Sequence, residues 1–257
     1  MQVTELWRYP VKSMRGERLD DAVLTDDGLT GDRIAHVYGP RGVLTARTRP
    51  RLLGLAGTLG PDGEPLVNGR PWDDQATAAA VREAAGVGAG MGGYDGPERF
   101  DVLPLLVATD GAIKALGVDG RRLRPNIVLG GVPGLAERSW PGKALRIGET
   151  LIGVQSVRGR CIMTTIDPDT GEQDLDVLRR IHRQFAGTMA LNCWVVRGGR
   201  IRVGQRAEVV DLDADPPPGG GWITGAPYRR PEPRCLRGRR SAGQAHRGTD
   251  EGPPTGG

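Results

Sequence analysis

The chain is poor in the residues that form metal clusters and disulfide frameworks. Its 257 residues include three cysteines and three histidines, and neither a CxxC nor an HExxH motif occurs. These counts argue against a zinc site with the usual Cys/His spacing and against a fold stapled by disulfides. Aromatic residues are also few, with 2 Phe, 4 Tyr and 5 Trp. We therefore expect aliphatic side chains to build the core.

Long apolar runs are missing as well. The run from Val102 to Ala108 is interrupted by Pro104, and it falls far short of the roughly 20 residues that a membrane-spanning helix needs. The opening segment MQVTELWRYP lacks the basic-then-apolar pattern of a secretory signal. We expect a protein of the cytoplasm with no membrane partner.

Positive charge is concentrated at one end of the chain. The net charge is +4, and residues 216–257 hold seven Arg against three acidic residues, which accounts for all of it. A nucleic-acid-binding domain would carry its basic residues on a folded face, so we expect no nucleic-acid partner. The same segment contains 8 Pro and 10 Gly. We predict that it is disordered, because it can bury little apolar surface.

Glycine and proline are abundant throughout. The 41 Gly and 20 Pro favour short strands joined by turns over a helical bundle. Residues 1–58 alternate between β-rich segments and turn clusters, and residues 74–85 form the first convincing helix. The glycine-rich segment 86–98 has the composition of a flexible connection between two lobes.

Residues 100–211 have the pattern of a second unit made of strands and short helices. We predict a strand at FDVLPLLVA and a helix at TDGAIKALG. Thr109 or Asp110 would cap the start of this helix, and Gly117 would end it. The many strands suggest a closed or nearly closed β structure with helices packed outside.

A second helix of this unit is predicted at LDVLRRIHRQFA, where Leu175, Leu178 and Ile181 would share one face. The fold class is therefore a β-rich α+β fold, with a β-barrel-like N-terminal domain and a second β-barrel with peripheral helices. The predicted boundaries are 1–96 for the first domain, 97–212 for the second and 213–257 for a disordered Pro/Gly/Arg-rich tail.

Cys161 is the first candidate for chemistry. It lies in GRCIMTTIDPDTGE at a strand edge, next to Arg158 and Arg160. Nearby cations favour the thiolate, the form that ligates a metal or attacks an electrophile. The alternative is a small buried apolar residue. That alternative suits Cys193, in LNCWVV, much better.

Other short patterns are weaker on their own. Lys-Ser, Asp-Arg and Arg-Pro-Asn occur near residues 12, 32 and 124, and such cations beside hydroxyl or amide groups suit a phosphate. Surface charge is the simpler explanation for each. The acids Asp167, Asp169 and Glu172 are explained by the turn chemistry of DPDTGE rather than by paired-carboxylate acid/base chemistry.

The order of the motifs carries more information than any one of them. The segments WRYPVKSMRGE, GLTGDR, VLTARTRPRL, RLRPNIVLGG, RCIMTTIDPDTGE and GRIRVGQ follow one another along residues 1–211. In this order they closely resemble the MOSC family, in which a MOSC N-terminal β-barrel domain precedes the molybdenum-cofactor sulfurase C-terminal domain. The RC-x-x-TT-x-DP-x-TG and RPN-I-V stretches are specific, whereas residues 58–96 match only loosely.

The resemblance implies a set of roles. In MOSC proteins related to the mitochondrial amidoxime reducing component, the Cys of the RC-x-x-TT stretch binds molybdenum, which corresponds to Cys161 as the metal ligand and catalytic residue. Thiolate is a soft ligand that suits such a metal. The positions that would hold the pterin and its phosphate are Lys12, Ser13, Arg33, Arg124 and Asn126, with Thr109 and Asp110 as less secure matches and Arg160 as an electrostatic neighbour.

The chain departs from the family pattern in places. Gly159 stands where many relatives have Ser, so one polar contact to the cofactor would be missing, and Gln205 replaces the Asp of a closing Val-Gly-Asp turn. A ferredoxin-like [2Fe–2S] cluster needs four Cys, and the tail offers only Cys235. We therefore expect no Fe–S cluster in this chain and a separate electron-donor protein of the ferredoxin or flavoprotein type.

Three functions follow. The first is a molybdenum-cofactor oxidoreductase that reduces small N-hydroxylated or N-oxide substrates. The second is a sulfur-carrier or cofactor-handling module, in which Cys161 carries a persulfide and any pyridoxal phosphate belongs to a partner. The third is a β-rich binding protein whose site has decayed.

Overall fold

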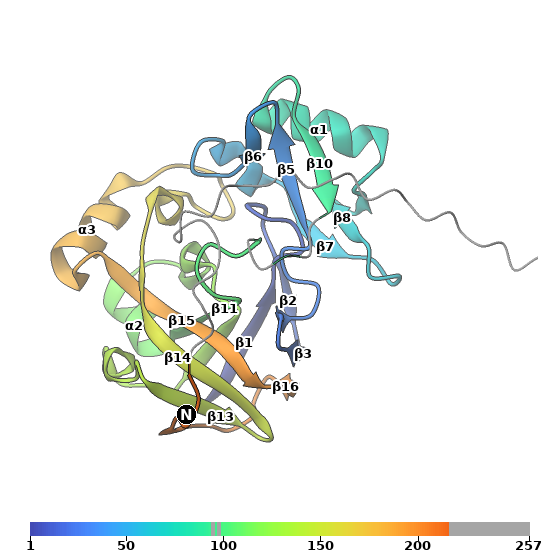
Figure 1. Cartoon of the computed structure of the whole chain (residues 1–257). Coiled ribbons are helices and arrows are strands. Elements are labelled where there is room, and N and C mark those ends of the chain that lie inside the picture. Colours follow the sequence, from blue (N-terminus) through green and yellow to red (C-terminus); the bar gives the residue numbers. More distant parts are fainter. Residues whose placement is uncertain (94–95, 97–98, 216–257) are drawn as a thin grey trace, which may run out of the picture.

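The computed structural model of the chain describes residues 1–93, 96 and 99–215 (Figure 1). Turns break the chain into many short strands, as the glycine and proline content predicts. In chain order the strands are β1 (Gln2–Arg8), β2 (Glu17–Leu19), β3 (Asp21–Thr25), β4 (Gly28–Leu29), β5 (Ala35–Gly39), β6 (Gly42–Leu44), β7 (Gly57–Leu59), β8 (Pro65–Val67), β9 (Arg70–Pro71), β10 (Gly90–Gly93), β11 (Leu105–Thr109), β12 (Ile127–Gly130), β13 (Lys143–Ile147), β14 (Thr150–Gly159), β15 (Thr188–Arg197), β16 (Gly199–Arg202) and β17 (Ala207–Asp211). The helices are α1 (Gln75–Ala85), α2 (Asp110–Leu116) and α3 (Leu175–Phe185), with the short 3-10 helices η1 (Pro50–Gly54), η3 (Gly120–Leu123), η4 (Ala136–Ser139) and η5 (Ile162–Thr165).

The main body is an eight-stranded sheet in the order β17-β13-β14-β15-β11-β12-β1-β2. Its two ends are joined near the N-terminus, where Val3 N donates to Gln205 O at 2.9 Å and Ala207 N donates to Met1 O at 3.1 Å. These bonds lay the first strand beside the last and close the sheet on itself, which removes exposed edges. The interior is aliphatic, as the composition predicts, with Trp140 as the one aromatic side chain of this core cluster.

The N-terminal β-hairpins contribute to this body. β1 pairs with β12, and β3 pairs with β16. Figure 1 shows β1 and β3 beside the later strands rather than with β5 and β10. Most of the buried side chains in the first 29 residues therefore share a core with the second half of the chain, whereas Val11 and Met14 pack with Val37 in a separate core. The domain limits 1–96 and 97–212 stay a prediction.

A smaller lobe is built from residues 35–93. It contains the sheet β10-β5-β6, the sheet β7-β8-β9 and helix α1, over a core that includes Val37, Leu52 and Val81. The prediction of a flexible connection was wrong for its middle part, because β10 pairs with β5. The Tyr38 ring lies 2.9 Å from where a Gly90 Cβ would stand, so glycine lets the ring cover this strand.

The predicted helices form. Asp74 caps α1 through a bond from Ala76 N at 2.8 Å, and α2 lies between Thr109 and a left-handed Gly117. The predicted strand at 100–108 begins only at Leu105, because the chain before it forms a loop that ends in Pro104. None of the helices within the described ranges is long and apolar enough to cross a membrane.

The predicted face of α3 was wrong. Leu175 is 44% exposed, and the buried side chains are Val177, Ile181 and Phe185, spaced four residues apart. Leu178 is half-buried and Ile181 is fully buried, so only Leu175 leaves the packed face. Residues at i, i+3 and i+6 spread over about 120° of a helix with 3.6 residues per turn. The predicted tail at 213–257 lies, from residue 216 on, outside the described residues.

Candidate active site

Seven of the residues singled out in the sequence line one open cleft of about 740 Å³. They come from four separate stretches: the turn after β1, the turn before β5, the turn before β12 and the end of β14. The seven are Lys12, Ser13, Arg33, Arg124, Asn126, Arg160 and Cys161. Clefts of this size are the usual location of small-molecule and cofactor sites.

Three of these residues have a backbone that non-glycine residues rarely adopt. Ser13, Arg33 and Arg124 have φ angles of 69°, 53° and 56°. The left-handed region costs a residue with a side chain about 1–2 kcal/mol. Such residues cluster at ligand-binding sites, where the surrounding structure enforces the strained turn. Their meeting at one cleft supports its identification as a functional site.

Asp101 organises the cations at one side of the cleft. The buried Lys12 ammonium lies 2.8 Å from Asp101 Oδ1 and also donates to Arg99 O at 2.8 Å. Asp101 Oδ2 accepts from Arg47 at 2.6 Å and from Arg158 at 3.2 Å. Burial opposes ionisation of this carboxyl, but the charges of Lys12 and Arg47 hold the Asp101 pKa well below its usual value.

Arg124 forms the wall on the opposite side. Its guanidinium lies 4.2 Å from the centre of the Tyr9 ring, and burial lowers the pKa of Arg124 to about 10. Arg33 lies 5.4 Å from the same ring and pairs with the buried carboxylate of Asp32. Tyr9 is itself fixed by a bond from its hydroxyl to Pro125 O at 3.1 Å. The aromatic ring therefore sets the position of two cations.

Cys161 lies at the start of η5, half-buried, where it lines the cleft. Arg47 interacts with its thiol as well as with Asp101. Arg160 donates to Leu123 O at 2.8 Å, while its buried Nε has no partner among the described residues. Burial, followed by the like charge of Arg158, lowers the pKa of Arg160 to about 10. The thiol is thus surrounded by guanidinium groups.

Asn126 lines the cleft, but its side chain forms hydrogen bonds with the backbone of two strands. Its Oδ1 accepts from Leu106 N at 3.1 Å, and its Nδ2 donates to Trp7 O at 3.3 Å. This fully buried amide joins the strands β1 and β11. Its main contribution to the cleft is to fix the turn that carries Arg124.

Thr109 and Asp110 are not brought to the cleft. The Thr109 hydroxyl accepts from Ala112 N at 3.2 Å as the cap of α2, and the side chain is fully buried. Asp110 accepts from Gly131 N at 2.7 Å and Val132 N at 3.0 Å. Both residues hold α2 to the strand beside it, so the geometry supports no contact between them and a ligand in the cleft.

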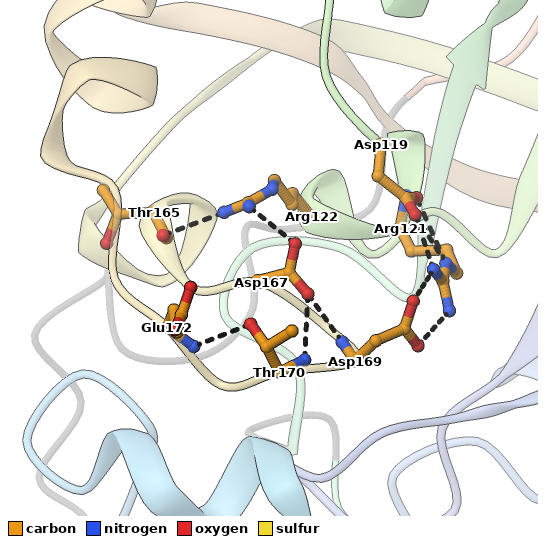
Figure 2. Close-up of polar contacts among 8 residues, drawn as sticks. All are labelled: Asp119, Arg121, Arg122, Thr165, Asp167, Asp169, Thr170 and Glu172. Carbon is orange, nitrogen blue, oxygen red and sulfur yellow. Dashed lines mark hydrogen bonds and ion pairs between the residues drawn. The ribbon is translucent and has the colours of Figure 1, made fainter.

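The acids of the DPDTGE turn act as the sequence indicated. Asp167 Oδ1 accepts from Asp169 N at 2.9 Å and Thr170 N at 3.0 Å, and Asp167 Oδ2 pairs with Arg122 at 2.8 Å (Figure 2). Asp169 pairs with Arg121 at 2.5 Å. All of these carboxylates are committed to the turn and to arginines, as expected of a structural loop.

Sequence reasoning missed Arg47 and Asp101 and gave Arg158 no role of its own at the site. Arg47 lies in the quoted VLTARTRPRL motif, so the signal was present but not assigned to a residue. Asp101 had no local signal, because its role depends on partners 54 to 89 residues away. Gly159 is exposed, and a Cβ there would meet nothing within 4 Å, so its replacement of the family's Ser leaves open space at the rim.

The charge balance of the cleft indicates what it can bind. Six cationic side chains and one carboxylate line it: Lys12, Arg33, Arg47, Arg124, Arg158 and Arg160 against Asp101. Crowded cations repel one another unless an anion is present. Within the described ranges no three His, Cys, Asp or Glu side chains gather in a position to hold a metal ion. The cleft is built for a ligand with several negative charges.

Comparison with known proteins places the chain in context. It is 27% identical to mitochondrial amidoxime-reducing component 1 of Homo sapiens over 230 residues, covering 66% of this chain and 67% of the relative. It is 27% identical to mitochondrial amidoxime reducing component 2 of Macaca fascicularis over 240 residues, covering 69% and 71%. The solved structure of the YuaD protein from Bacillus subtilis superposes with a TM-score of 0.44 at 13% identity, covering 82% of this chain and 96% of the other.

Two domain families match directly. The MOSC N-terminal beta barrel domain matches residues 1–84, and the MOSC domain matches residues 108–208. Both matches lie in the order that the motifs predict. They include most of the sheet and of the cleft, while Asp101 and Leu105 lie between them. MOSC domains are associated with binding of the molybdenum cofactor. The chain therefore belongs to the MOSC family, with a MOSC N-terminal beta barrel domain followed by a MOSC domain.

Proposed function

We propose that this protein is a molybdenum-cofactor-dependent oxidoreductase that reduces small N-hydroxylated or N-oxide substrates in the cytoplasm. The observation that supports it is the excess of six cations over one carboxylate around a single thiol in one cleft. A phosphorylated pterin with sulfur ligands is the polyanion that such a cleft would neutralise. The similarity to amidoxime-reducing components supports the reaction class.

The residues present fit that group. Lys12, with its ammonium held by Asp101, and the half-buried Arg33 and Arg124 would bind the pterin phosphate. Arg160 offers an unpartnered buried Nε that a ligand oxygen would satisfy. Cys161 would provide the one protein thiolate to the metal, and the cofactor would supply the remaining soft ligands.

When bound, the cofactor would supply the oxygen-accepting and electron-carrying chemistry. The chain's own residues would position it. Arg47 would lie beside the metal-binding thiol. The Tyr9 ring would keep Arg124 in place. Electrons would come from a separate ferredoxin or flavoprotein, because no Fe–S or pyridoxal-phosphate site is proposed in this chain.

Metal and pterin analysis tests the proposal. The full chain is purified from a host that makes the cofactor, and molybdenum and pterin phosphate are measured per protein. We expect close to one of each in the wild type. Cys161→Ser should lose most of the molybdenum while keeping its melting temperature, since Cys161 packs at the cleft rather than in the core. Cys193→Ser is the matched control and should keep the metal, because Cys193 is fully buried in the main core.

Equal molybdenum in the wild type and in Cys161→Ser would contradict the ligand assignment. The alternative function, a sulfur or cofactor carrier, is favoured by the half-buried position of Cys161 among cations. It predicts cyanide-releasable sulfur on Cys161 and no reductase activity with an artificial electron donor. A protein with neither molybdenum nor such sulfur would support a decayed site.

A further inference from the structure

A second cavity of about 470 Å³ lies next to the cleft and shares Arg124 and Met163 with it. Its walls come from distant parts of the chain: Trp7 from β1, Leu53 from η1, and Ile166 from the segment after η5. Cys161, the proposed metal ligand, does not line this cavity. Pockets with mostly apolar walls and a few polar groups are the usual form of small-molecule sites.

The apolar surface of this second pocket is largely aromatic and branched. Tyr9, Trp7, Leu53 and Ile166 line it, and Gly16 lies beneath the Tyr9 ring. A Cβ at Gly16 would lie 2.5 Å from a ring carbon of Tyr9, so only glycine lets the ring lie this close to the backbone. The Tyr9 ring is thus held between Gly16 and Arg124, and Trp7 contributes the aromatic surface suited to a planar apolar group.

Four arginines and no carboxylate line the second pocket. Two of them are already neutralised. Arg121 pairs with Asp119 at 2.6 Å and with Asp169 at 2.5 Å, and Arg122 pairs with Asp167 at 2.8 Å. Figure 2 shows these pairs fastening the turn at residues 167–172 beside η3. They build the rim of the pocket and leave little positive charge for a ligand.

The other two arginines, Arg15 and Arg124, are not paired with a carboxylate among the described residues. Arg15 donates to Gly54 O at 3.3 Å, while its buried Nε has no hydrogen-bond partner. Arg124 is stacked on Tyr9. Neither forms an ion pair with a carboxylate in the part of the chain that the structure describes. A buried guanidinium donor without a partner loses its hydration and gains nothing in return, so an anion entering here would be stabilised.

We propose that this second pocket binds a small monocarboxylate with a flat apolar body. The carboxylate would accept hydrogen bonds from Arg15, whose planar fork matches a carboxylate. The apolar body would lie against Trp7, Leu53 and Ile166. A phosphate-rich ligand fits less well, because most of the wall is apolar and two of the arginines are occupied. The site is distinct from the proposed metal centre, since its walls do not include Cys161, although it shares Arg124 and Met163 with the main cleft.

Calorimetric titration of the full chain, with and without molybdenum cofactor, tests this. The probes are phenylacetate and its neutral isostere phenylacetamide. We expect phenylacetate to bind one site and phenylacetamide to bind at least about tenfold more weakly, because the amide cannot pair with Arg15. Arg15→Gln should weaken phenylacetate about tenfold and leave phenylacetamide unchanged. Ile166→Trp should block both probes by filling the pocket.

Arg18→Gln is the matched control, because Arg18 is exposed on β2 and lies outside the pocket. It should leave both affinities unchanged. Melting temperatures show whether each variant is folded. If Ile166→Trp does not fold, the comparison of Arg15→Gln with the wild type tests the proposal by itself. Equal affinity for acid and amide, or no effect of Arg15→Gln, would overturn the proposal. Binding that vanishes once the cofactor is loaded would also overturn it, because the anion would then have occupied the main cleft.

Discussion

The ammonium of Lys12 lies 2.8 Å from Oδ1 of Asp101, although 89 positions separate the two residues in the sequence. The side chains of both are mostly buried, with 9% and 21% exposed. This pair joins the turn after β1 to the loop before β11. It also fixes Lys12 at the cleft, where the cation is positioned for an anion.

Asp101→Asn should lower the free energy of unfolding by about 2 kcal/mol, because Lys12 and Arg47 would lose their carboxylate. The folded-state pKa of Asp101 is lowered. The stabilisation by the Asp101 carboxylate is therefore complete above the pKa of Asp in the unfolded chain, about 4. It is lost as the pH falls from there towards the lower folded-state pKa. Urea titrations at pH 6 and pH 3 should show a larger difference at pH 6. Asp26→Asn, on an exposed turn, should change neither.

His36→Gln should flatten the pH dependence of stability on the acid side of neutrality. Burial, followed by the charge of Lys12, lowers the pKa of His36 from 6.5 to about 4. Between pH 6.5 and 4, His36 is protonated in the unfolded chain but neutral in the folded chain. The free energy of unfolding therefore falls as the pH is lowered through this range, by about 3 kcal/mol at most. Thermal melts across that window measure it. A wild-type slope unchanged in the variant would refute the assignment, and the exposed His182→Gln serves as control.

Ile181→Ala should lower the free energy of unfolding by about 2–4 kcal/mol, because Ile181 is fully buried on the packed face of α3. Leu175→Ala should cost less than about 0.5 kcal/mol, because 44% of Leu175 is exposed at the start of the helix. Denaturant unfolding of the two variants compares them directly. Similar losses for the two variants would show that Leu175 is packed, as the sequence predicted, and would contradict its exposure in the structure.

A chain that ends at Asp215 should keep its melting temperature and its molybdenum content. Residues 216–257 hold seven Arg and 18 Gly or Pro, a composition that buries little apolar surface. Reduction by an acidic protein donor should slow on truncation at low salt, because the arginines would no longer attract it, and the difference should fade as salt rises. Loss of the cofactor or of folded structure on truncation would show that the predicted boundary near residue 212 is misplaced.

Local patterns in the sequence were sufficient to predict the helices and the family. Turn residues, helix caps and short-range motifs act between neighbours in the chain, so α1, α2 and the 167–172 turn could be recognised directly. The motif order also named Cys161 and four of the six cations that the cleft brings together, but not Arg47 or Arg158. Local pattern predicted the helix cap at Thr109 correctly, whereas the resemblance also assigned Thr109 to the cofactor, which its position does not support.

Tertiary structure decided the rest. The pairing of β1 with β12 and of β10 with β5 joins residues 52 or more positions apart, and no local pattern specifies such a register. The same holds for Asp101, because a lone Asp in a loop carries no signal until folding surrounds it with Lys12, Arg47 and Arg158. Burial determined which charges matter, since a cation in water interacts weakly and a buried cation requires a partner. The sequence determined which chemical groups are available, and the packing of distant segments determined which of them share a site.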